Sequence, residues 1–211
     1  GDTGSMDGLS ALFVIIISVG AVAAVLYSRG YLAHCLAEKS PAHISLHYTA
    51  LVVLFYAMLG VVLSDGGFSF LFFWELMTVA SFLLILFDAQ RREVRRAALS
   101  YLIMMHIGFV LLVIGFVRLD TACGAATFGA LGDYFRTQPG LPLLLVFLAG
   151  FGMKAGLFPM HVWLPEAHPA APSHVSALMS GVMIKTGVYG ILRVTAALGE
   201  QPLLHLSLIH I

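Results

Sequence analysis

The sequence predicts an all-α, polytopic transmembrane helix bundle of about six spanning helices, one of them broken by proline. Hydrophobic residues make up 60% of the 211 residues and charged residues only 10%, and the mean hydropathy is +0.95. This composition leaves too little polar surface for a soluble globule. The apolar residues gather in runs of about 20, long enough to cross a hydrocarbon core of about 30 Å. We therefore expect a multi-pass protein of the inner (plasma) membrane, surrounded by the lipid bilayer.

The connections between the runs are polar or turn-forming. Residues 1–8 form a polar lead without the basic region of a cleaved signal peptide, and residues 64–67 form a tight turn rich in Asp and Gly. The carboxy-terminal residues LLHLSLIHI stop within apolar sequence, so we expect residues 1–211 to be part of a larger transmembrane domain. The expected spans lie near 9–27, 46–63, 68–87, 97–117, 141–158 and 174–198.

The loop lysines and arginines predict the orientation. They divide six to three between the two sides: Arg29, Lys39, Arg91, Arg92, Arg95 and Arg96 on one, Arg118, Arg136 and Arg193 on the other. Cytoplasmic loops carry the excess of Lys and Arg. We expect the side with six to be cytoplasmic and the amino terminus to lie outside.

The stretch around residues 150–193 carries the most informative pattern. Lys154, His161 and His168 are seven apart, which would place them on one face if a helix resumed after an interruption. Pro159 and Pro165 weaken that inference, and we interpret residues 159–172 as a break. Discontinuous helices in membranes occur where protein or water satisfies the freed backbone, and transporters place ion sites there.

Three charged residues interrupt apolar runs: Glu75, Lys154 and Lys185. A lysine at the centre of a span costs roughly 2.5 to 3.5 kcal/mol and usually faces the bundle interior. Gly152 and Gly156 bracket Lys154 in a GxxxG pattern that permits close backbone approach, and Gly181 and Gly187 flank Lys185. We expect both lysines inside the packed bundle. Glu75 lies only about two helical turns into its span, so a carboxyl near the membrane surface is the alternative to a functional one.

Four histidines are further relay candidates, since an unperturbed imidazole titrates near pH 6.5. Each is equally compatible with a structural hydrogen bond: His106, His161, His168 and His174. We expect no metal, because no pair has the H-E-x-x-H spacing.

We expect no cofactor either. The two cysteines, Cys35 and Cys123, are too few for an iron–sulfur cluster with about four ligands. A net charge of zero gives no case for nucleic-acid binding. If the chain belongs to an oxidoreductase, it carries no redox centre itself.

Three motifs resemble the antiporter-like proton-translocating subunits of respiratory complex I and of membrane-bound hydrogenases. They are WELMTVASFLLILF, GMKAGLFPMHVWLPEAHPAAPSHVSAL and SGVMIKTGVYGILR. The segment HPAAPSHVSALMSGVMIKTGVYG is most similar to the branch of the family that contains hydrogenase 4 component B and formate hydrogenlyase subunit 3. The resemblance implies that Glu75 is a charge partner, Lys154 the central proton carrier and Lys185 a relay, with His161 and His168 in the hinge. It also implies a fold of two inverted five-helix repeats, of which this chain holds one.

The resemblance implies proton translocation by a subunit of a redox-driven complex, of the NADH:quinone oxidoreductase type or the hydrogenase and formate hydrogenlyase type. Its partners would be other membrane subunits. Burial disfavours a charged lysine and a nearby carboxylate favours it. Moving the Glu75 charge relative to Lys154 would therefore load and unload that lysine, and Lys185 would receive the proton through water. The alternatives are a subunit of a multisubunit cation/proton antiporter and a membrane scaffold without transport.

Overall fold

The chain folds as a bundle of helices. The computed structural model describes residues 7–35 and 39–199, and 84% of these described residues are helical. Within the described ranges no strand is present, and one isolated bridge joins Gly66 to Thr127. The predicted all-α class is confirmed.

Long apolar helices dominate the bundle. Among the described residues, five stretches have the length and hydropathy to cross a membrane, 22 to 32 residues each, which confirms a multi-pass membrane protein. They comprise α1 (Gly8–Cys35), α2 (Pro41–Leu63), α3 (Gly67–Ile85) with η1 (Leu86–Asp88), α4 (Arg92–Cys123), and a rod made of α8 (Ser173–Leu178), the π-helical η2 (Met179–Met183) and α9 (Ile184–Ala196). A shorter apolar helix, α6 (Gly140–Ala155), has 16 residues. Two further short helices are α5 (Ala130–Thr137) and α7 (Leu164–Ala170).

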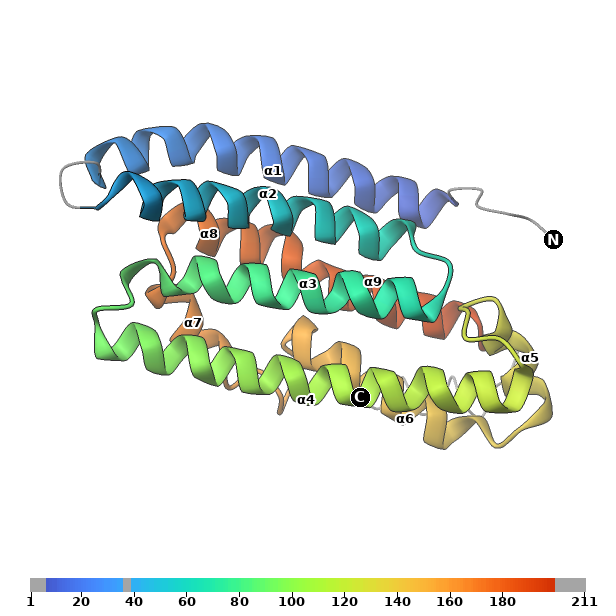
Figure 1. Cartoon of the computed structure of the whole chain (residues 1–211). Coiled ribbons are helices and arrows are strands. Elements are labelled where there is room, and N and C mark those ends of the chain that lie inside the picture. Colours follow the sequence, from blue (N-terminus) through green and yellow to red (C-terminus); the bar gives the residue numbers. More distant parts are fainter. Residues whose placement is uncertain (1–6, 36–38, 200–211) are drawn as a thin grey trace.

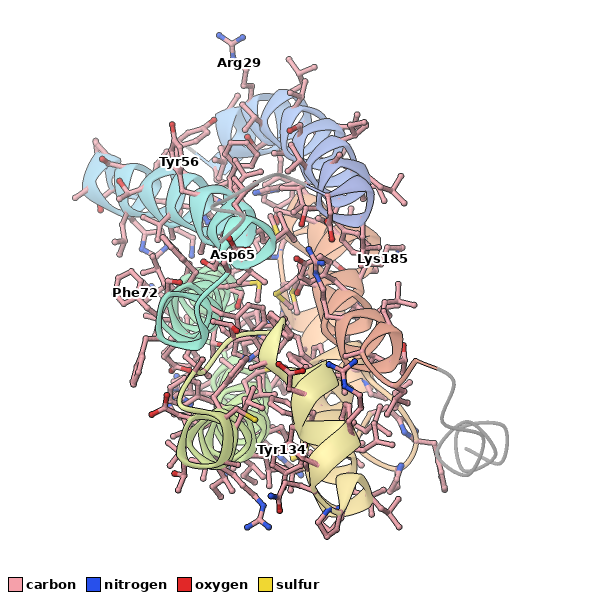
Figure 2. All side chains as sticks on the ribbon, turned by 90° about the vertical axis from the view of Figure 1, so that its right-hand side faces the viewer. Arg29, Tyr56, Asp65, Phe72, Tyr134 and Lys185 are labelled. Atoms are coloured by element: carbon pink, nitrogen blue, oxygen red, sulfur yellow. The ribbon has the colours of Figure 1, made fainter. Side chains whose placement is uncertain are left out.

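The helices pack side by side in two rows (Figures 1 and 2). Consecutive long helices α1 to α4 are neighbours, while α6 packs against both α4 and α9, and α8 returns to α1. Large apolar side chains such as Tyr56 and Phe72 point away from the bundle (Figure 2). In a protein that crosses a bilayer, this apolar exterior faces lipid.

Connections gather at the two ends of the bundle. Lys39, before α2, forms an ion pair with Asp88 of η1 at 2.6 Å. At the opposite end, Gly67 at the start of α3 donates a backbone hydrogen bond to Ala126, after α4. The arginine-rich segment 91–96 therefore lies at the Lys39 end, and the α2–α3 turn lies at the other (Figure 1).

Close backbone contact occurs at glycines other than the predicted GxxxG pair. A Cβ on Gly187 of α9 would lie 2.6 Å from the Ala155 nitrogen, and one on Gly108 of α4 would lie 3.0 Å from the Gly150 oxygen. Gly156 instead ends α6 in the left-handed conformation, with φ of 68°, which glycine adopts without steric cost. The expectation that Gly152 and Gly156 permit the close backbone approach was therefore wrong. Neighbouring helices do approach the α6 backbone, but through Gly187 and Gly108.

Helix boundaries differ from the hydropathy runs in several places. Helix α1 continues to Cys35, helix α4 spans Arg92–Cys123, and α5 occupies part of the segment expected to be a polar loop. Helix α6 ends at Ala155 because Gly156 terminates it. Hydropathy reports where the apolar residues are, whereas a helix continues until a cap or a glycine ends it.

Candidate functional site

Lys154 lies at the centre of the candidate site. It occupies the last turn of α6, and only 1% of its surface is exposed. Its Nζ donates a hydrogen bond to Thr78 Oγ1 of α3 at 2.8 Å and lies 4.8 Å from the centroid of the Trp74 ring. A buried amine is thus held by a hydroxyl and an aromatic face, as expected for a lysine inside the bundle.

The lysine is positioned by the packing of α3, α4 and α6. Trp74 stacks on Phe70 and meets the edge of Phe151, one turn before Lys154. Trp163, after the α6 break, donates its ring N–H to the Met153 carbonyl at 2.9 Å. That bond satisfies a carbonyl left free at the end of α6. These aromatic contacts leave the Lys154 stem little room to move.

A row of hydroxyls continues from Lys154 along α3. Ser81 Oγ donates to the Thr78 carbonyl at 3.0 Å and lies 2.5 Å from the Tyr101 hydroxyl of α4. Thr78 and Ser81 are buried, and so is Tyr101. Residues three apart on a helix share a face, so the row follows one side of α3.

Glu75 lies on the same helix, one turn before Thr78. It is half-buried, and its Oε1 lies 2.9 Å from His106 Nε2 of α4. Its Oε2 is buried and has no hydrogen-bond partner among the described residues. Lys154 and Glu75 form no direct ion pair in the described part of the chain, but the carboxylate is near enough to act on the lysine electrostatically. Thr78, one turn along α3 from Glu75, is the contact of Lys154 instead.

Lys185 lies apart from this site, on the exposed face of α9 (Figure 2). The expectation that it points into the packed bundle was wrong. Gly187 faces the α6 backbone, and residues two apart on a helix point about 200° apart, so Lys185 faces away from α6. Its Nζ donates to the Ser180 carbonyl at 3.0 Å, which lies within the π-helical turn of η2.

The proline-rich break does not bring its histidines onto the face of Lys154. Residues 156–163 form turns, α7 follows, and Pro169 lies inside α7. His161 lies in the turns, with a buried Nδ1 that lacks a partner in the described part of the chain. His168 Nδ1 contacts Ser176 Oγ at 2.9 Å. The predicted interruption is present: α6 ends at Ala155, so the seven-residue spacing spans turns and the three residues do not share one helical face.

Sequence reasoning missed the neutral partners of the charged groups. Thr78 and Ser81 follow Glu75 at intervals of three, and this spacing was the available signal. It also missed His47 of α2, whose Nε2 lies 2.7 Å from His174 Nε2 of α8. The sequence separation of 127 residues gave no signal for that contact. Within residues 7–35 and 39–199, no group of three His, Cys, Asp or Glu side chains could hold a metal ion.

Comparison with known proteins identifies the family to which this chain is similar. The family described as NADH:quinone oxidoreductase/Mrp antiporter, TM, matches residues 64–210. Hydrogenase-4 component B of Escherichia coli (strain K12) is 38% identical over 201 residues, 93% of this chain and 29% of the relative. The putative antiporter subunit mnhA2 of Staphylococcus aureus (strain MRSA252) is 33% identical over 199 residues, 92% of this chain and 24% of the relative.

A solved structure of the Mrp complex from Dietzia sp. DQ12-45-1b superposes with a TM-score of 0.82 at 25% identity, covering 94% of this chain and 22% of that one. The chain thus spans less than a third of the length of each protein it matches. These relatives are subunits of multisubunit membrane complexes. The family match covers more than half of the chain and confirms the resemblance: this chain belongs to the NADH:quinone oxidoreductase/Mrp antiporter transmembrane family.

Proposed function

We propose that the chain forms part of a proton-translocating membrane subunit of a redox-driven complex, of the hydrogenase or NADH:quinone oxidoreductase type. Its partners are other membrane subunits of that complex, and a redox partner in the complex supplies the driving energy. The 38% identity to hydrogenase-4 component B supports the hydrogenase type. Lys154 carries the proton, Glu75 controls its charge, and Lys185 receives the proton. His106 tunes Glu75, and His161 and His168 line the approach through the hinge.

The burial of Lys154 carries this proposal. Its contacts are a neutral hydroxyl and an aromatic ring, while the nearest carboxylate acts from a distance. A structural lysine in a membrane is normally paired with a carboxylate or backbone carbonyls, and a paired charge is held in one state. An amine with a neutral partner can exist with or without its extra proton, which a carrier requires.

The Glu75–His106 contact supplies the control. The contact with His106 occupies Glu75 Oε1, and loss of that contact leaves the carboxylate to act more fully on Lys154. The two side chains lie 2.9 Å apart on neighbouring helices, so a small displacement of α3 against α4 changes their interaction. Such a displacement couples the charge near Lys154 to events elsewhere in the complex.

The test is Lys154→Met in the full-length subunit, assembled into its complex in inverted membrane vesicles. Methionine fills similar space without a proton to exchange. We expect substrate-driven proton transport to fall by about tenfold or more, with assembly retained. Arg29→Met, which removes an exposed cation from α1 (Figure 2), is the matched control and should transport normally. Normal transport by Lys154→Met would overturn the proposal and leave the chain as a scaffold.

A cation/proton antiporter subunit is the second candidate, and the 33% identity to a putative antiporter subunit favours it. The same vesicles distinguish the two functions. A redox-driven subunit moves protons when the electron donor is added and does not need a sodium gradient. An antiporter subunit moves protons in response to an imposed sodium gradient without any donor.

A further inference from the structure

Two histidines from distant parts of the chain meet at the arginine-rich end of the bundle. His47 of α2 and His174 of α8 face each other with their Nε2 atoms 2.7 Å apart. The side chains are 4% and 2% exposed. At this separation a hydrogen bond needs one nitrogen with a proton and one with a free lone pair. The pair therefore holds a single proton between its facing nitrogens.

Aromatic side chains enclose the pair. The Phe87 ring meets His47 edge-on at 4.8 Å between centroids, and the Tyr31 ring meets His174 at 5.3 Å. His174 Nδ1 is buried and has no hydrogen-bond partner among the described residues. The Nε2 atom of His174 therefore contacts His47, while its Nδ1 atom is free to take up a proton.

The charged and titratable groups around the pair come from four elements. Helix α1 contributes Tyr27 and Tyr31, and α2 contributes His43, whose Nε2 lies 2.9 Å from the Phe87 carbonyl. Asp88 of η1 is already engaged by Lys39, which lies between α1 and α2, at 2.6 Å. Asp88 is therefore paired with a lysine, and neither histidine forms an ion pair with a carboxylate in the described part of the chain.

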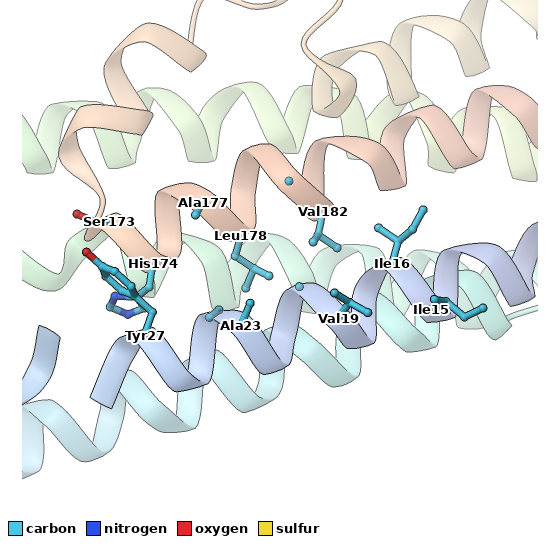
Figure 3. A pocket seen from close by; sticks show the side chains of 13 residues that line it. Ile15, Ile16, Val19, Ala23, Tyr27, Ser173, His174, Ala177, Leu178 and Val182 are labelled. Atoms are coloured by element: carbon cyan, nitrogen blue, oxygen red, sulfur yellow. The ribbon is translucent and has the colours of Figure 1, made fainter. Parts of the chain in front are cut away.

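A cavity reaches the pair from the side. It lies between α1 and the α8–η2 rod and has a volume of about 750 Å³. Figure 3 shows Tyr27 and His174 together at one end of it, with apolar side chains such as Val19 and Ile16 along the rest. The polar groups of the cavity are thus concentrated where it meets the histidines.

The pair also lies toward the end to which the row of hydroxyls from Lys154 leads. Phe87, which contacts His47, is six residues beyond Ser81, or about 9 Å along a helix. Ser81 joins Tyr101 and the Thr78 carbonyl, and the Thr78 side chain joins Lys154. The hydroxyl row thus starts at Lys154 and runs toward the end of the bundle that holds the histidine pair, with the apolar residues 82–86 between Ser81 and Phe87.

We infer that His47 and His174 form a proton-loading site for Lys154; this inference rests on the function proposed above. A proton arriving from the arginine-rich end binds His174 Nδ1. The proton on His174 Nε2 then passes to the lone pair of His47 Nε2, which leaves His174 neutral and His47 charged. His47 then releases its Nδ1 proton to an acceptor toward the hydroxyl row and becomes neutral again, so that one proton enters at His174 and one leaves at His47.

The test uses His47→Gln, His174→Gln and the double variant in the full-length subunit within its complex. Glutamine can hydrogen-bond across the helices but does not titrate. We expect each single variant to assemble and to reduce substrate-driven proton transport by about tenfold, with the double variant no worse than either single one, because the two residues act as a unit. The pH profile of transport should differ from that of the wild type. His43→Gln, one turn away on α2, is the matched control and should keep the wild-type profile.

Several outcomes would overturn the inference. Assembled Gln variants with unchanged transport and an unchanged pH profile would leave the pair as a structural contact between α2 and α8. Should the variants fail to assemble, nitrogen NMR of the wild-type subunit with labelled histidine decides. A shared proton gives a coupling between the two Nε2 atoms and a joint titration, whereas independent titration of the two rings contradicts it. Lys154→Met separates the two proposals: if it stops transport while the histidine variants do not, only the loading site fails.

Discussion

At the scale of single residues, the two charged groups of the site do not contact each other. Lys154 rests on Thr78 and Trp74, and Glu75 rests on His106. A direct lysine–glutamate pair would be strong but would hold both charges in place. The two groups instead have separate partners, so neither charge is fixed in place by the other.

This arrangement predicts the behaviour of Glu75 variants. Glu75→Gln removes the charge that favours the loaded state of Lys154, so proton transport should fall by about tenfold or more. Glu75→Asp keeps the charge at a shorter reach and should retain part of the activity. Both variants should assemble, because Glu75 is only half-buried. Proton uptake by vesicles of the assembled complex is the measurement, and wild-type transport by Glu75→Gln would remove Glu75 from the mechanism.

Variants of Lys185 distinguish a proton relay from a structural cation. A relay needs a group that releases its proton, and arginine does not deprotonate in proteins. Lys185→Met and Lys185→Arg should therefore both lose most transport while assembling normally, because the side chain is exposed and its contact is a backbone carbonyl. Proton transport and assembly are to be scored separately in the full-length subunit. Full transport by Lys185→Arg would mean that the charge alone is needed.

At the scale of elements, glycines set how closely the helices approach. Helix α9 lies against the α6 backbone at Gly187, beside the turn that carries Lys154. The same contact turns Lys185 outward. The site thus depends on a residue with no polar chemistry, because the absence of a side chain brings two backbones together.

Gly187→Ala should separate these helices. The added Cβ would lie 2.6 Å from the Ala155 nitrogen and 2.8 Å from the Phe151 oxygen, and backbone atoms cannot move aside as a flexible side chain can. We expect a destabilisation of about 1 to 3 kcal/mol, as for other overpacked cores, together with reduced transport. Gly181→Ala is the matched control, since a Cβ there meets nothing within 4 Å. Thermal unfolding of the purified subunit compares the two variants, and equal stability would show that α9 shifts at no cost.

At the scale of the whole molecule, the two ends of the bundle differ in charge. Lys39 and the arginines of segment 91–96 gather at one end, while the α2–α3 turn lies at the other (Figure 1). The histidine pair lies at the basic end, next to Phe87. A loading site at that end would take its protons from the cytoplasm if the basic end is cytoplasmic.

Cysteine labelling tests this orientation. In the full-length subunit with Cys35 and Cys123 replaced by serine, a cysteine at Gln90 should resist a membrane-impermeant reagent added to intact cells. A cysteine at Asp65, exposed at the opposite end (Figure 2), should react and serves as the control. Labelling at Gln90 but not at Asp65 would reverse the topology.

The sequence by itself determined the helical membrane class, the family and the identity of the charged residues. These follow from hydropathy and from motifs that are local in the chain, so they need no knowledge of which helices touch. Lys154 could be placed inside the bundle because a charge deep in an apolar run has few other places to go. Only the tertiary structure decided that Thr78 rather than Glu75 contacts Lys154, that Lys185 faces outward, and that His47 meets His174. These depend on which faces of helices far apart in sequence pack together, and backbone contacts such as that of Gly187 with α6 set the rotation of each helix.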